Sequence, residues 1–149
     1  MNKILLILLL FLSSCGYQPI YLNKNLENIK YSKINLIGDG DINKKIINTI
    51  PVSENGENEN LNQLFISSSY KIEPASKSSK GLINSFRTIV DVSLKIENSN
   101  NNVIQNKNFV KQFIYNKKQN NFELIEYQNS IKDDLVDIII SEIIIFLNS

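Results

Sequence analysis

Few side chains of this 149-residue chain are of the types that carry enzyme chemistry. The chain has no histidine and a single cysteine, which excludes histidine-based catalytic triads, zinc sites built from histidine or several cysteines, and any internal disulfide. The remaining candidates for acid–base work are Asp133, Asp134 and Asp137, spaced along one segment. A solvated helix face also explains these aspartates and is the interpretation we adopt, so we predict no enzyme activity, no catalytic residue and no metal site.

The single cysteine lies in the most informative segment of the sequence. Lys3 is followed by nine consecutive apolar residues (4–12), and two serines then lead directly into Cys15. Nine residues are too few to span a bilayer, because a helix rises about 1.5 Å per residue against a hydrocarbon core about 30 Å thick. With Leu12 three positions before Cys15, the pattern is a lipobox and predicts cleavage of a signal peptide between Ser14 and Cys15. The alternative is an ordinary signal peptide that happens to contain a cysteine.

The lipobox also predicts how the mature chain is held in place. Cys15 is expected to carry a covalent lipid, and because each buried methylene contributes about 0.8 kcal/mol, two or three acyl chains anchor a protein to a membrane. Gly16 follows the cysteine directly, and an Asp in its place would signal retention in the inner membrane. The general sorting rule for bacterial lipoproteins therefore favours the outer membrane, on its periplasmic side. We therefore expect a cleaved signal peptide (1–14), a lipid-anchored arm (15–32) and one domain (33–149).

A second set of candidates is a basic segment that contains no acid. The segment runs from Lys77 to Arg87 and includes Lys80. Several cations with little neighbouring acid can hold phosphate groups through charge-assisted hydrogen bonds. A solvated turn that is basic for solubility is the alternative interpretation. The whole chain carries 16 Lys and Arg against 15 Asp and Glu, a net charge of +1, so we expect no nucleic-acid partner.

The elements that position these residues are predicted from periodicity. A short apolar run at 34–37 stops at a Gly-Asp-Gly turn and predicts a strand. Asp41 stands in N-cap position for a helix that carries isoleucines on one face and ends at Pro51. Residues 22–32 are polar and irregular, which suits a lead-in arm, and residues 53–62 carry almost nothing to bury, which predicts a solvated loop.

Three longer strands follow in the sequence. Alternation with a period of two predicts strands over 64–73, 86–97 and 103–116, joined by a Ser- and Lys-rich turn at 74–81 and a hairpin turn at 98–102. The even-numbered side chains of the second strand are expected in the core. The third strand is apolar on both faces, with Phe109, Phe113 and Tyr115 on one and Ile104, Val110 and Ile114 on the other.

A long helix is predicted over 122–147. After Val136 its apolar residues fill eight of the ten positions from 138 to 147, and one sheet face cannot cover a helix that is apolar all round. The extra isoleucines reflect either the composition of an ordinary terminal helix or a surface that contacts another protein. The expected buried stripe consists of Leu124, Ile131, Leu135, Ile138, Glu142 and Ile145.

Together these elements predict an α+β fold, with a four-stranded, mostly antiparallel sheet, two helices packed on one face, and a long C-terminal helix. Besides this order of elements and the lipobox, the chain contains two short motifs. They are the opening Cys-Gly-Tyr-Gln-Pro-Ile-Tyr (15–21) and the Phe-Ile-Tyr-Asn (113–116) that leads into the long helix. In these features the chain resembles the lipopolysaccharide-assembly lipoprotein family LptE (RlpB), alphaproteobacterial type. The last helix of that family is usually rich in Ala and Arg, whereas here it is rich in Ile and Asp.

The resemblance implies a function in the cell envelope. It implies an LptD-type β-barrel translocon of the outer membrane as the partner, in which the protein is plug and assembly factor, and direct binding of lipopolysaccharide through basic residues near a strand turn. The family contact matches Lys80 beside Gly81, and only Lys117 and Lys118 could supply a second basic position near the last helix. The alternative function is a generic periplasm-facing envelope lipoprotein that scaffolds another envelope protein or peptidoglycan.

Overall fold

The structure is a computed structural model and describes residues 28–58 and 60–149. The expected signal peptide, its cleavage between Ser14 and Cys15, and the lipidation of Cys15 lie outside the described residues. None of the helices in the described ranges is both long and apolar enough to cross a membrane. The elements in chain order are β1 (Ile29–Tyr31), β2 (Lys33–Gly38), α2 (Gly40–Thr49), β3 (Val52–Glu54), β4 (Gln63–Lys77), β5 (Ile83–Glu97), β6 (Val103–Asn116) and α3 (Asn121–Leu147).

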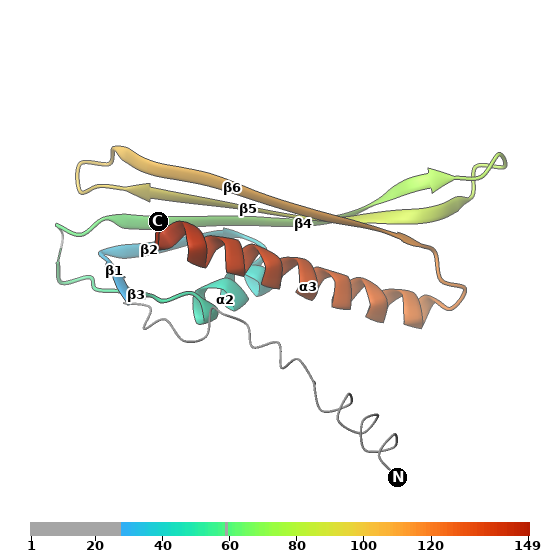
Figure 1. The fold of residues 1–149 in the computed structure, drawn as a ribbon, viewed down its shortest axis with the longest axis horizontal. Coiled ribbons are helices and arrows are strands. Elements are labelled where there is room, and N and C mark those ends of the chain that lie inside the picture. Colours follow the sequence, from blue (N-terminus) through green and yellow to red (C-terminus); the bar gives the residue numbers. More distant parts are fainter. Residues whose placement is uncertain (1–27, 59) are drawn as a thin grey trace, which may run out of the picture.

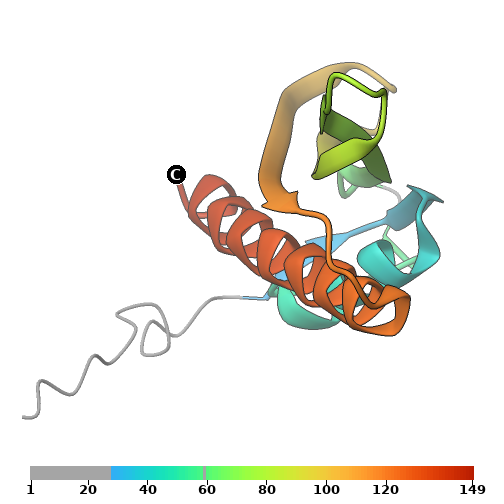
Figure 2. The same cartoon turned by 90° about the vertical axis from the view of Figure 1, so that its right-hand side faces the viewer.

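The main sheet has four strands in the order β2-β4-β5-β6. β2 runs parallel to β4, whereas the β4–β5 and β5–β6 pairs are antiparallel. Both helices lie on the same side of this sheet (Figures 1 and 2), where α2 packs against β2 and β4, and α3 packs against β5 and β6. The predicted α+β architecture is therefore confirmed.

The core lies between the sheet and the two helices. The even-numbered side chains of β5 point into it as predicted, because side chains alternate between the faces of a strand. Leu64 and Ile66 on β4 and Ile42 and Ile46 on α2 complete its centre, each at most 1% exposed. The buried residues at even positions of β5 are Thr88, Val90, Val92, Leu94 and Ile96, and the odd-numbered Ser85 is buried near the start of the strand.

The connection from β2 to α2 is a tight turn with a defined cap. Asp39, two residues before the predicted Asp41, is the N-cap of α2, and its carboxylate accepts hydrogen bonds from the backbone N–H groups of Asp41 (3.1 Å) and Ile42 (3.0 Å). The N–H of Ile42 is the main reason that the pKa of Asp39 is lowered from its ordinary value. Asp41 is an acidic residue of the first turn, where it interacts favourably with the helix dipole.

Gly38, the last residue of β2, occupies a position in this turn where any side chain would be strained. Its φ of 93° lies in the left-handed region, and a Cβ at this position would overlap the backbone carbonyl oxygen of Ser68 on β4. Ser68 also donates a hydrogen bond from its hydroxyl to the Asp39 carbonyl (3.1 Å). The turn is thereby fixed against the neighbouring strand.

Two short strands lie at the end of the predicted arm and at the start of the predicted loop. β1 pairs in parallel with β3 and aligns Ile29 with Val52 and Tyr31 with Glu54. Tyr31 is 3% exposed and belongs to the core, so the folded domain begins before the expected residue 33. Strands of three residues are too short for a period of two to be recognised in the sequence.

The β4–β5 hairpin is longer than predicted. β4 continues through Pro74 to Lys77, so the turn comprises residues 78–82 rather than 74–81. The pairing register shifts between Pro74 and Ser76, and such irregularities are places where a strand tolerates proline.

α3 buries a different stripe from the one expected. Ile131 and Leu135 are buried as predicted, whereas Ile138 and Ile145 are 47% and 50% exposed, and Glu142 forms an ion pair with Lys111 on β6. Because isoleucine occurs on every side of this helix, the sequence pattern could not select the buried face. The buried residues are Ile131, Leu135, Val136, Ile139, Ile140 and Ile143.

Candidate functional site

The β4–β5 hairpin places Lys77 and Lys80 at one end of the sheet. The turn is closed by hydrogen bonds from the N–H of Ser78 to the Leu82 carbonyl (2.8 Å) and from the N–H of Gly81 to the Ser78 carbonyl (2.9 Å). Gly81 has a φ of 78°, which favours glycine. Lys80 is therefore held at the tip of the hairpin beside Leu82, whose side chain is 68% exposed.

The connection from β6 to α3 brings two further lysines to the same end. Lys117 and Lys118 lie between the last residue of β6 and the N-cap of α3, Asn120. The N–H of Lys117 donates a hydrogen bond to the carbonyl of Asn84, near the start of β5 (2.8 Å), and Figure 1 shows both connections at the same end of the sheet. We call this group of side chains the basic end: Lys77, Lys80, Lys117 and Lys118.

The lysines of the basic end are exposed and not neutralised by neighbours. All four are exposed, and within residues 28–58 and 60–149 none has a carboxylate oxygen within 4.0 Å. The nearby acid in the first turn of α3 is Glu123. This end of the sheet thus offers several ammonium groups to an anionic ligand.

Arg87 does not join the basic end. It lies opposite Glu73 in the β4–β5 register, and its guanidinium Nη1 is 3.5 Å from Glu73 Oε1, while Lys71 Nζ is 3.4 Å from Glu73 Oε2. Because Arg87 adjoins buried Thr88 in the strand, its side chain leaves from the sheet face opposite the helices. The structure therefore brings together Lys77 and Lys80 but places Arg87 in an ion-pair cluster elsewhere.

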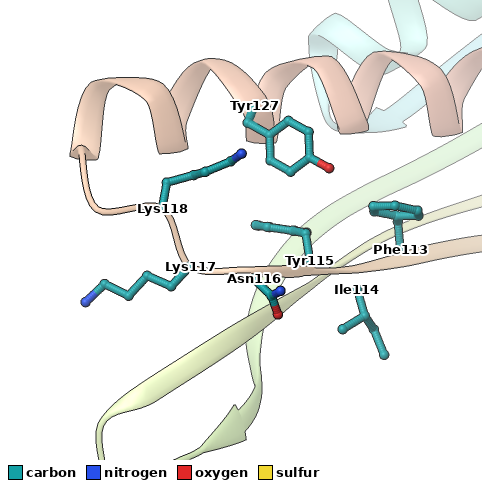
Figure 3. A pocket seen from close by; sticks show the side chains of 7 residues that line it. All are labelled: Phe113, Ile114, Tyr115, Asn116, Lys117, Lys118 and Tyr127. Atoms are coloured by element: carbon teal, nitrogen blue, oxygen red, sulfur yellow. The ribbon is translucent and has the colours of Figure 1, made fainter.

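An aromatic cavity adjoins the basic end (Figure 3). In the figure Phe113 and Tyr115 point toward α3, Ile114 points the opposite way, and the amine of Lys118 reaches Tyr127. The Lys118 Nζ is 4.8 Å from the centroid of the Tyr127 ring, a cation–π contact, and the Tyr115 and Tyr127 rings meet edge to face with centroids 5.6 Å apart. The cavity measures about 490 Å³ and is lined by Phe113, Ile114, Tyr115, Asn116, Lys117, Lys118 and Tyr127.

The sequence did not predict this cavity. Phe113 and Tyr115 were predicted on one strand face, but Tyr127 comes from α3 and nothing in the sequence connects it to them. The available signal is local, since aromatic residues at alternate positions of β6 directly precede Lys117 and Lys118. Walls of aromatic rings with amines at the rim can accept a ligand that combines apolar and anionic groups.

Two of the three aspartates considered for acid–base work form ion pairs between the helices. Lys45 on α2 approaches Asp137 Oδ1 at 2.8 Å and Asp133 Oδ1 at 3.8 Å, and it donates a hydrogen bond to the backbone carbonyl of Asp133 (3.3 Å). Asp134 is exposed to solvent, as the solvated-face interpretation expects. In the part of the chain that the structure describes, no three His, Cys, Asp or Glu side chains are grouped to hold a metal ion.

Known proteins are similar to this chain in fold. No protein-family model matches the sequence, and no curated protein matches it. The solution structure of an uncharacterized lipoprotein B from Nitrosomonas europaea is 14% identical with a TM-score of 0.54, and the match covers 89% of this chain and 94% of that one. A minor lipoprotein from Acinetobacter baumannii is 14% identical with a TM-score of 0.52, over 78% of this chain and 90% of that one. The rare lipoprotein B from Shewanella oneidensis is 12% identical with a TM-score of 0.41, over 78% and 99%.

At these identities the likeness concerns the fold alone. The structures from Nitrosomonas and Acinetobacter share most of their length with this chain. The comparison thus agrees with the architecture that the resemblance to the LptE family implied.

Proposed function

We propose that this chain is an outer-membrane lipoprotein of the LptE type, which is anchored through Cys15, faces the periplasm and catalyses no reaction. In this proposal it acts with an LptD-type β-barrel translocon in the assembly of lipopolysaccharide and binds lipopolysaccharide at the basic end. The observation that carries the proposal is that the β4–β5 hairpin and the β6–α3 connection bring four exposed lysines to the end of the sheet where the aromatic cavity lies. The lipobox at Cys15 and the fold shared with lipoprotein B support it.

The chemistry of the basic end fits the lipid A part of lipopolysaccharide. Lipid A carries phosphates and acyl chains on a sugar backbone, so a binding surface needs cations and apolar area side by side. Lysine provides a mobile point charge for phosphate, while Leu82 at the hairpin tip and Phe113 at the cavity are exposed apolar surfaces, 68% and 46% respectively. Binding that depends on these lysines weakens as salt concentration rises.

The binding proposal is tested with two pairs of charge reversals. Lys77→Glu with Lys80→Glu, and Lys117→Glu with Lys118→Glu, are each expected to weaken lipopolysaccharide binding about tenfold, which corresponds to roughly 1.4 kcal/mol. Binding of the purified variants and wild type is measured at one fixed salt concentration. Equal affinity of wild type and both variants means that the basic end is not the site.

A matched control separates local from overall charge effects. Lys30 and Lys33, exposed residues of β1 and β2, are replaced by glutamate to give the same change in net charge. Lys33 aligns with Gln63 at the start of β4, so it lies at the end of the sheet remote from the hairpin turn, and the control is expected to bind like wild type.

The partner proposal is tested separately. Affinity purification of the chain from detergent-solubilised outer membrane is expected to recover a large β-barrel protein in stoichiometric amount. Recovery of a different envelope protein or of peptidoglycan, without a barrel, assigns the chain to the alternative class of envelope scaffold.

A further inference from the structure

β6 forms one edge of the main sheet over an unusual length. It is the last strand in the order β2-β4-β5-β6, and no other described strand pairs with its outer side. It comprises 14 residues, compared with about five or six in a typical strand. A free edge of this length presents a row of backbone N–H and C=O groups to whatever strand approaches it.

The backbone groups that face this free edge belong to the even-numbered residues. The β5–β6 register is continuous from Ser85↔Asn116 to Ile96↔Gln105, and the N–H of Lys117 donates to the Asn84 carbonyl at its start. In an antiparallel pair the bonded positions alternate along the strand. Odd-numbered residues therefore bond with β5, whereas even-numbered residues such as Val110 direct their N–H and C=O outward.

Apolar side chains along the same edge are exposed on the face of the sheet away from the helices. On the face away from the helices, Ile104, Val110 and Ile114 are 50%, 49% and 52% exposed. On the helix side, a groove of about 440 Å³ lies between β6 and α3, lined by Lys107, Phe109, Glu142, Ile145, Phe146 and Ser149. Proteins normally protect long edges by proline, bulges or charge. The pairing register of this edge shifts once, near the start of β6, where Ile96 pairs with Gln105 but Glu97 pairs with Val103; from Gln105 to Asn116 the pairing is regular and the lysines are the charged residues.

The charges of this edge select the type of strand that fits it. Residues 103–118 contain four lysines and no Asp or Glu. Lys107 and Lys111 flank Phe109 on the helix side. Lys111 forms an ion pair with Glu142 (2.5 Å). Lys107 has no carboxylate oxygen within 4.0 Å among the described residues. A second copy of this chain would bring the same lysines together, which is unfavourable, whereas opposite charges across paired strands are stabilising.

We propose that the outer edge of β6 binds an extended segment of another protein, which adds a fifth strand to the sheet. Acidic side chains of that segment face Lys107, and its apolar side chains pack beside Ile104, Val110 and Ile114. Main-chain hydrogen bonds supply affinity, and the side chains on alternate positions supply specificity, as in other cases of strand addition. The proposal rests on β6 alone and is independent of the basic end and of lipopolysaccharide.

Two synthetic peptides test this proposal with the purified full-length protein. Both have about twelve residues, the length of an edge of this size, and alternate valine with either glutamate or lysine. Fluorescence anisotropy of labelled peptides is expected to show at least tenfold tighter binding of the glutamate peptide. Bound peptide is expected to slow hydrogen exchange at the even-numbered amides of β6.

Substitutions at Val110 identify the backbone contact. Val110→Pro removes an N–H that faces the free edge and leaves the bonds to β5 in place, so it is expected to weaken binding of the glutamate peptide tenfold or more. Val110→Ala, the matched control, keeps the N–H and is expected to bind within about threefold of wild type.

Lys107→Glu tests the charge contact without altering the backbone, and it keeps the proposal falsifiable if Val110→Pro does not fold. This variant is expected to lose the preference for the glutamate peptide and to bind the lysine peptide more tightly than wild type does.

Four results overturn the proposal. In the first the glutamate peptide does not bind, and in the second both peptides bind equally. In the third the wild-type protein forms a dimer that Val110→Pro abolishes. In the fourth the even-numbered amides of β6 are already protected from hydrogen exchange in the free protein. The third result makes a second copy the occupant, and the fourth makes residues 1–27 of the same chain the occupant.

Discussion

Replacing Ile139 by alanine is expected to destabilise the domain far more than the same change at its neighbour Ile138. Ile139 is 0% exposed and lies in the core, whereas Ile138 is 47% exposed. The substitution removes three carbon atoms, and at about 0.8 kcal/mol per buried methylene the transfer term at Ile139 is roughly 2.4 kcal/mol. The cavity that remains brings the expected loss to about 3 to 4 kcal/mol.

At Ile138 the same change has a small effect for three reasons. About half of the removed surface is already in water, no closed cavity forms, and alanine favours the helix by a few tenths of a kcal/mol over isoleucine. The expected loss is therefore about 1 kcal/mol or less.

The assay is urea unfolding followed by circular dichroism, with the free energy of unfolding extrapolated to water. Near-UV spectra of both variants show whether the native packing is retained before urea is added. Equal losses, or a larger loss at Ile138, refute the orientation of α3 and place the stripe of Leu124, Ile131 and Ile138 in the core instead.

Three further changes test the turn and the anchor. Asp39→Ala is expected to lower stability by about 1 kcal/mol through loss of the N-cap. The pKa of Asp39 is lowered in the folded state, so its contribution to the free energy of unfolding is complete above the unfolded-state pKa and is lost as pH falls through the folded-state pKa. The unfolding curves of wild type and Asp39→Ala are therefore expected to converge in acid. A difference in stability that stays constant with pH contradicts this account. Gly38→Ala is expected to lower the thermal midpoint strongly, since φ is 93° and the Ser68 carbonyl occupies the space of the new Cβ; an unchanged midpoint shows that the turn relaxes freely. Cys15→Ser is expected to leave an uncleaved or soluble precursor that no longer fractionates with membranes, and unchanged size and membrane retention contradict lipidation.

Local patterns predicted the strands well, because alternation along β5 directly determines which side chains face the core. Thr88 through Ile96 follow it without exception at even positions. The buried face of α3 could not be predicted in this way, because isoleucines occur on all sides of the helix. The orientation of α3 is evident only from contacts between residues far apart in the sequence, such as the ion pairs of Lys111 with Glu142 and of Lys45 with Asp137.

The candidate site was predictable in part for a similar reason. Lys77 and Lys80 share one hairpin, so their proximity follows from the sequence. Lys117 joins them because β6 returns antiparallel to β5 and ends beside Asn84, which the predicted meander already implies. The contribution of Tyr127 depends on how α3 crosses the sheet, and no local pattern encodes that crossing.

The position of α3 after all strands in chain order has a consequence for the order of folding. The pairs β4–β5 and β5–β6 join neighbouring segments, and such local hairpins form within microseconds once both strands are available. They then present the apolar side chains of one sheet face, among them Leu64, Val92 and Leu94, until α3 docks on that face. Chains at this stage are prone to aggregate, so the interval between pairing of β6 and docking of α3 is the most aggregation-prone step in the folding of the domain.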